Sequence, residues 1–105
     1  MTHDLPKAMK REIRQLGAVV HERLLAAELR KLDAEFARWR SGEIDAFELG
    51  SLIHLFHEGP PRQLWLSFNT HHVSVLSHHL VEALAEGTLR PEEVSEETLA
   101  FLSRK

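Results

Sequence analysis

The sequence predicts an all-α fold: a small helical bundle with three main helices and a short C-terminal helix, in a single domain over residues 1–105. Three observations carry this prediction. Apolar residues recur with helical spacing along nearly the whole chain. β-branched residues never cluster in the period-two alternation typical of strands. Finally, glycines and prolines stand between the periodic segments, where helices begin and end, and 105 residues make one ordinary domain.

The first helix is expected over residues 7–40. Pro6 suits a first helical turn, Asp4 is a candidate N-cap, and Ser41-Gly42 provides a stop because glycine adopts the left-handed cap. About 34 residues at 1.5 Å each give roughly 50 Å. A compact domain of this size has a diameter of roughly 35 Å, so we expect this helix either to project or to kink.

Two apolar stripes run along the first helix, rotated from each other by roughly 140°. The first stripe contains Met9, Ile13, Leu16, Val20, Leu24 and Ala27, and the second contains Ala18, Leu25, Leu29, Leu32, Phe36 and Trp39. A kink near residues 17–22 would bring both stripes to one core. The alternative, which we favour, is that the second stripe binds the chain's own core and the first packs on a second copy. This predicts a homodimer interface formed by Ile13, Leu16, Val20 and Leu24.

The second helix has clear end signals. Asp45 and Glu48 have the spacing of a capping box, and Gly59 ends the helix. A third helix is expected from Pro60-Pro61 to about Glu86, weakened but not broken at Asn69-Thr70.

The tail is expected to turn at Pro91 and to form a short helix capped by Ser95. Leu99, Phe101 and Leu102 would dock this helix on the bundle.

Composition narrows the classes of function. The chain has no cysteine, which removes disulfides, thiolate metal sites and thiol catalysis and favours a reducing, cytoplasmic and bacterial-type setting. No apolar run approaches the roughly 20 residues of a membrane span. Residues 1–40 carry nine Lys/Arg and six Asp/Glu, whereas residues 41–105 carry four and ten. This asymmetry suits pairing between the two halves, or head-to-tail pairing with a second copy, and the net charge of −3 does not favour nucleic-acid binding.

No pattern typical of catalysis is present. The sequence has no H-E-x-x-H, no G-x-S-x-G and no glycine-rich phosphate loop. We therefore expect no catalytic residue, no cofactor and no metal.

The candidate binding site is a corner formed by His54, His57 and Arg62. The two histidines are spaced i, i+3, which places two imidazoles on one helix face, although a metal needs three or four ligands. Gly59-Pro60-Pro61 is expected to fold the third helix back on the second, which would bring Arg62 near both histidines. A separate basic cluster, Lys7, Lys10, Arg11 and Arg14, is either a solvated face, a partner for the acidic residues 92–97, or a phosphate contact.

The segment from Phe47 to Trp65 carries a resemblance. Phe47-Glu48-Leu49, Ile53-His54, Phe56-His57, Gly59, Arg62 and Leu64-Trp65 resemble the central segment of a group of small uncharacterised bacterial all-helical proteins. The resemblance covers about a fifth of the chain. It implies a helical fold and no activity.

Taken together, these observations predict a non-catalytic, self-associating interaction or regulatory module. It would form a homodimer and could also bind a protein partner. A metal or small-ligand binder using His54, His57 and Arg62 is the alternative, and a nucleic-acid-associated regulator using the basic cluster is a weaker one.

Overall fold

The computed structural model describes residues 5–104, and all regular structure within that range is helical. The elements in chain order are α1 (Lys7–Arg40), α2 (Ala46–Glu58), α3 (Pro60–Phe68), α4 (Val73–Glu86), the 3-10 turn η1 (Pro91–Glu93) and α5 (Glu96–Ser103). The predictions of an all-helical chain and of a long first helix are confirmed. Asp4, the candidate cap of α1, lies outside the described residues.

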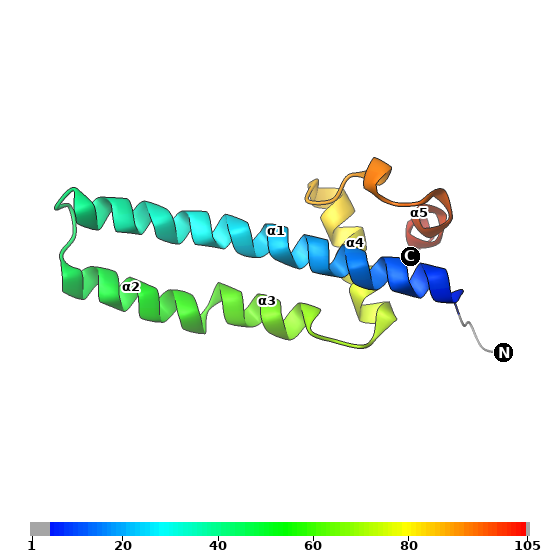
Figure 1. Ribbon diagram of the computed structural model, residues 1–105, viewed down its shortest axis with the longest axis horizontal. Helices are drawn as coiled ribbons and strands as arrows, with labels where there is room; N and C mark the ends of the chain where they lie inside the picture. The colour runs from blue at the N-terminus through cyan, green and yellow to red at the C-terminus, as the bar shows by residue number, and fades with distance from the viewer. Residues whose placement is uncertain (1–4, 105) are drawn as a thin grey trace.

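The molecule consists of a head and an arm (Figure 1). The head contains the N-terminal half of α1 with α4, η1 and α5. The arm contains the C-terminal half of α1, with α2 and α3 running back alongside it (Figure 1). The overall dimensions are 60 × 25 × 19 Å and the radius of gyration is 17.7 Å, against roughly 13 Å for a compact domain of this length. The expected projection is therefore present. The alternative of a kink or break near residues 17–22 that brings both stripes to one core is wrong, because α1 is one continuous helix of 34 residues and the second stripe lies outside the core.

The hydrophobic core lies in the head. It is formed by Met9, Ile13, Leu16, Val20, Leu76, Leu80, Ala83, Leu89, Val94 and Leu102. Ile13 and Leu80 are fully buried. Leu99 and Phe101 of α5 pack against this cluster, as the sequence predicted.

The predicted dimer interface is therefore wrong in its location. Ile13, Leu16 and Val20 are buried in the chain's own core, and Leu24 is half-buried against it. We expected this stripe to lack intramolecular partners because the apolar face changes along the first helix and because that helix is too long for its own domain. We also expected residues 60–86 to form one helix. The structure breaks that helix, and α4 crosses α1 over this stripe.

The break lies at residues 69–72. Helix α3 ends at Phe68, and the Thr70 hydroxyl accepts a hydrogen bond from the backbone N–H of His72 at 3.1 Å. Short polar side chains such as threonine offer the backbone a local partner that competes with helix continuation. The predicted third helix is therefore two helices, and the chain has one main helix more than expected.

The crossing of α1 and α4 depends on a small residue. Gly17 is buried, and a Cβ atom placed on it would lie 3.2 Å from Cδ2 of Leu76. Ser77, the neighbour of Leu76 on α4, is fully buried. Small residues let two helix backbones approach closely, so Gly17 sets how near α4 lies to α1.

Polar contacts of Glu12 and Arg23 fasten the C-terminal segment to α1. The Glu12 carboxylate accepts hydrogen bonds from the backbone N–H of Ser95 at 2.8 Å, the Ser95 hydroxyl at 2.7 Å and the Thr98 hydroxyl at 2.6 Å. The Arg23 guanidinium donates to both carboxylate oxygens of Glu93, at 2.6 and 2.9 Å. As predicted, Ser95 caps α5, accepting from the Thr98 N–H.

The arm is held together more weakly. Of its large apolar side chains, Ile44 and Leu49 are buried. The predicted capping box is confirmed: the Asp45 side chain accepts from the Glu48 N–H at 2.8 Å, and the Glu48 side chain accepts from the Asp45 N–H at 3.1 Å. Gly42 has a φ of +82°, in keeping with its expected role in ending α1.

Candidate interaction surface

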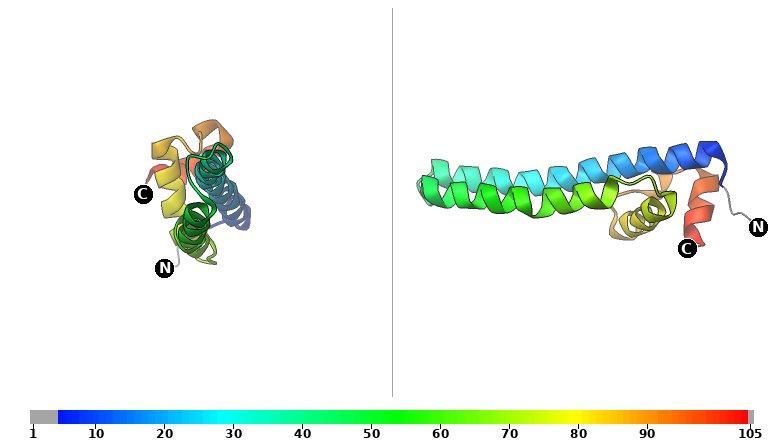
Figure 2. Two further views of the ribbon diagram at one scale, coloured as in Figure 1. Left: turned by 90° about the vertical axis from the view of Figure 1, so that its left-hand side faces the viewer. Right: turned by 90° about the horizontal axis from the view of Figure 1, so that it is seen from below.

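One side of the arm is left uncovered. Helices α4 and α5 lie on a single side of the plane that α1 and α2–α3 define (Figure 2). We call the opposite side of the arm the open face. Its apolar residues are Leu25, Leu29 and Phe36 of α1, Ile53 of α2 and Trp65 of α3, as helical spacing from the covered residues shows.

The α1 part of the open face points away from the core. Leu29 follows the core residue Val20 by nine positions, which is two and a half turns and places the two side chains on opposite sides of the helix. Leu29 is 47% exposed, while Leu25 and Phe36 are half-buried. Leu29 and Phe36 were expected to bind the chain's own core, but here they lie beyond its reach.

The α2 and α3 residues of the open face are identified from the residues that line hollows on the opposite side of the arm. On one side of the arm, Leu24 and Ser67 line a hollow together with His79 and Ala83 of α4. Further along the same side of α1, Lys31 and Leu55 line another hollow, which α4 does not reach. Ile53 lies about 160° around α2 from Leu55, and Trp65 lies about 160° around α3 from Ser67. Ile53 and Trp65 are 39% and 55% exposed, so both belong to the open face.

The arm as a whole is richer in exposed apolar side chains than the head. The exposed large hydrophobic residues of the arm are Leu29, Trp39, Phe47, Ile53, Leu55, Trp65 and Leu66, whereas the rest of the described chain adds Val19 and Val75. Scattered apolar residues are ordinary on a protein surface, but a concentration on one projecting element marks an interaction site.

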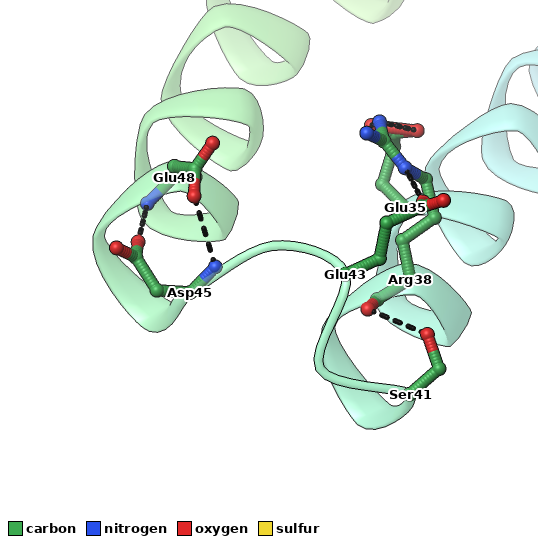
Figure 3. A network of polar contacts seen from close by, with 6 residues as sticks. All are labelled: Glu35, Arg38, Ser41, Glu43, Asp45 and Glu48. Carbon is green, nitrogen blue, oxygen red and sulfur yellow. Dashed lines mark hydrogen bonds and ion pairs between the residues drawn. The ribbon is translucent and has the colours of Figure 1, made fainter.

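The tip of the arm carries a charged network (Figure 3). Arg38 donates to Glu35 at 3.0 and 3.1 Å and also to Glu43. The hydrogen bonds that Arg38 donates, first to Glu43 and next to Glu35, raise its pKa. Together with the capping box, this network fixes the turn between α1 and α2, so the tip is a structured end rather than part of the apolar surface.

The junction of arm and head contains a stack of rings. Phe68, the last residue of α3, lies between His21 of α1 and His79 of α4, with ring centroids 5.3 and 4.8 Å away. His79 also approaches Glu82, with Nδ1 3.5 Å from the carboxylate. The stack joins three helices where the arm meets the head, and sequence spacing alone could not bring these rings together.

The predicted corner of His54, His57 and Arg62 is not formed. Helix α3 continues along α1 in the direction of α2 rather than folding back on it (Figure 1), because Gly59 interrupts the helix without reversing the chain. All three side chains are exposed, and within residues 5–104 no hydrogen bond or ion pair joins them. In the same range, no group of three His, Asp or Glu residues could hold a metal ion.

The basic cluster is present as a surface feature. Lys7, Lys10, Arg11 and Arg14 line a shallow hollow along the first turns of α1. Of the acidic residues considered as partners of this cluster, namely Glu92, Glu93, Glu96 and Glu97, Glu93 binds Arg23 instead. The described residues that line this hollow include no aromatic side chain of the kind that single-stranded nucleic acids stack on.

Comparisons with protein-family models, curated proteins and solved structures give no match. The resemblance of residues 47–65 to small bacterial proteins therefore stays a prediction. Over the described residues, no helix is both long and apolar enough to cross a membrane.

Proposed function

We propose that the chain is a non-catalytic interaction module that self-associates through the open face of its arm. The observation that carries the proposal is the uncovered apolar strip over Leu29, Ile53 and Trp65, on an element that projects from the core. A two-helix arm has no third layer against which to bury this strip. Pairing two arms face to face would supply that layer and form a four-helix arrangement.

The size of the strip suits a modest homodimer. Leu29, Ile53 and Trp65 are 47%, 39% and 55% exposed. If a large side chain has an area of roughly 150–250 Å², these three residues together expose about 300 Å² of apolar surface. A standard interface buries about 800 Å² per partner, somewhat more than half of it apolar. Leu25, Phe36 and the small residues Ala46 and Gly50 would supply the remainder.

The test is the mass of the protein in solution. Sedimentation equilibrium at micromolar concentration should give about twice the 12.1 kDa of one chain. The double variant Leu29→Asp/Ile53→Asp should sediment as a monomer while keeping its helical circular dichroism, because both side chains lie outside the core. Leu55→Asp is the matched control: Leu55 is 65% exposed but lies on the other flank of the arm, so this variant should stay dimeric.

Two results would contradict the proposal. One is a wild-type mass of a single chain at concentrations up to about 100 μM, where even a weak association of about −5.5 kcal/mol would be half formed. The other is a dimer that Leu55→Asp dissociates and the double variant leaves intact, which would place the interface on the opposite flank of the arm, where Leu55 lies.

A further inference from the structure

The charges at the ends of the open face define how two copies would pair. We infer that they associate antiparallel, α1 against α1, with Glu22 of each copy facing Arg40 of the other. This inference rests on the self-association proposed above and adds its direction and register.

The open face of α1 carries an apolar stripe with opposite charges at its two ends and the exposed Asp33 between them, about 20° around the helix from Glu22 and Arg40. Asp33 would lie near its counterpart in either direction of pairing, so the two end charges decide between the directions. Glu22 precedes Leu25, Leu29 and Phe36, and Arg40 follows them. Glu22 and Arg40 are 18 residues apart, which is five full turns, so both project in the same direction about 27 Å apart. Both side chains are exposed, and within residues 5–104 neither makes a hydrogen bond or an ion pair.

This pattern distinguishes the two possible directions. In an antiparallel pair centred at residue 31, Glu22 meets Arg40 of the second copy, and by symmetry the same contact forms twice. Leu25 then lies opposite Phe36, and the two Leu29 side chains lie near the centre. A parallel pair would instead place like charges together at both ends, which is unfavourable.

Helices α2 and α3 of the arm fit the same register. Leu24 and Leu64 line one hollow, and Leu32 and Phe56 line another, so residue 31 of α1 lies beside residue 57 of α2. Trp65, eight positions beyond that centre, would face the region of Gly50 in the second copy. A Cβ atom on Gly50 would meet nothing within 4 Å, which leaves room for the indole ring.

The heads do not obstruct this arrangement. Helices α4 and α5 lie on the far side of the arm from the open face (Figure 2). Antiparallel pairing also sends the two heads to opposite ends of the dimer. Each head would then lie beside the tip of the other copy's arm.

The first experiment reverses the charges. Arg40→Glu and Glu22→Arg should each raise the dissociation constant roughly tenfold or more at low salt, since each turns two attractions into two repulsions. The double variant Glu22→Arg/Arg40→Glu should return to within about threefold of wild type. Arg30→Glu is the control: Arg30 is exposed on α1 but projects away from the open face, so its effect should be small.

The second experiment measures direction. The chain has no cysteine, so Ser41→Cys introduces a single site for a spin label near the tip. An antiparallel dimer centred at residue 31 places the two labelled positions about 30 Å apart along the helix axis, whereas a parallel dimer places them within about 10 Å.

The two proposals fail differently. A monomeric wild type overturns self-association itself. A dimeric wild type that is indifferent to both charge reversals, or whose labels lie within about 15 Å of each other, overturns the antiparallel register and leaves self-association standing.

Discussion

The contact between Glu12 and α5 gives a sharp test of how the head is held closed. Glu12→Ala removes the carboxylate that accepts from the Ser95 N–H, the Ser95 hydroxyl and the Thr98 hydroxyl. These residues lie more than 80 positions away along the chain. Because these hydrogen bonds join the last helix to the first, their loss should weaken the head as a whole.

The magnitude follows from what each lost bond leaves behind. Thr98 is 1% exposed, so its hydroxyl loses its partner without reaching water, at a cost of about 1–3 kcal/mol. The Ser95 groups are exposed and regain water, which limits their loss to about 0.5 kcal/mol each. We expect Glu12→Ala to lower the free energy of unfolding by about 2–4 kcal/mol. Glu12→Gln, which keeps an acceptor oxygen, should lose about half of that.

The assay is urea denaturation at pH 7 followed by circular dichroism. Glu97→Ala is the matched control, because it removes a carboxylate from the first turn of α5 that accepts no hydrogen bond within residues 5–104. That variant should change stability by less than about 0.5 kcal/mol. If Glu12→Ala were no more damaging than Glu97→Ala, the carboxylate of Glu12 would not be what secures α5.

Three further predictions follow from the head. Ile13→Ala should lower the free energy of unfolding by about 2–5 kcal/mol in urea titrations, since Ile13 is fully buried. If the variant instead dissociated a dimer without losing stability, Ile13 would belong to a dimer interface, as the sequence predicted. The Arg23 hydrogen bonds lower the pKa of Glu93 to about 2, and the hydrogen bonds to Glu12, outweighing its partial burial, hold the pKa of Glu12 below its usual value. Both pKa values lie below those of the unfolded chain, so stability should be full above about pH 5 and fall as the pH drops from about 4.5 towards 2. Glu93→Gln should make this fall less steep, and an unchanged slope would show that Glu93 does not contribute to it. Gly17→Ala should hardly change the melting temperature, because about 1 kcal/mol of helix propensity offsets the tight contact with Leu76. Gly17→Leu should destabilise the protein by about 2 kcal/mol or more. Equal melting temperatures for the two variants would show that α1 and α4 are loosely packed at Gly17.

The helix ends could be predicted because they depend on residues within about four positions of one another. The capping box at Asp45 and Glu48, the cap at Ser95 and the stop at Gly42 all belong to this kind. The length of α1 likewise predicted a projection, since no compact domain of this size accommodates such a helix.

The faces of α1 could not be assigned from the sequence because they depend on a distant turn. Whether Ile13 or Leu29 is buried is decided by where the chain changes direction after Phe68. No sequence feature near Ile13 or Leu29 indicates this change of direction. Once residues 60–86 are divided in two, α4 covers the first stripe, and Leu29 is left on the surface. The open face thus carries residues that the sequence predicted to be buried. The roles proposed for Glu22 and Arg40 depend on knowing that this face is exposed.

The arm also has a thermodynamic role that follows from its position in the chain. The head is discontinuous in sequence, because residues 5–23 and 73–104 pack together while the arm occupies the stretch between them. A flexible connection of that length would cost about 3 kcal/mol of chain entropy on closing. The paired helices of the folded arm return the chain beside its point of departure, so much of that entropy is already lost before the head assembles. Stabilising the arm, for instance by covering its open face, should therefore raise the stability of the core of the head.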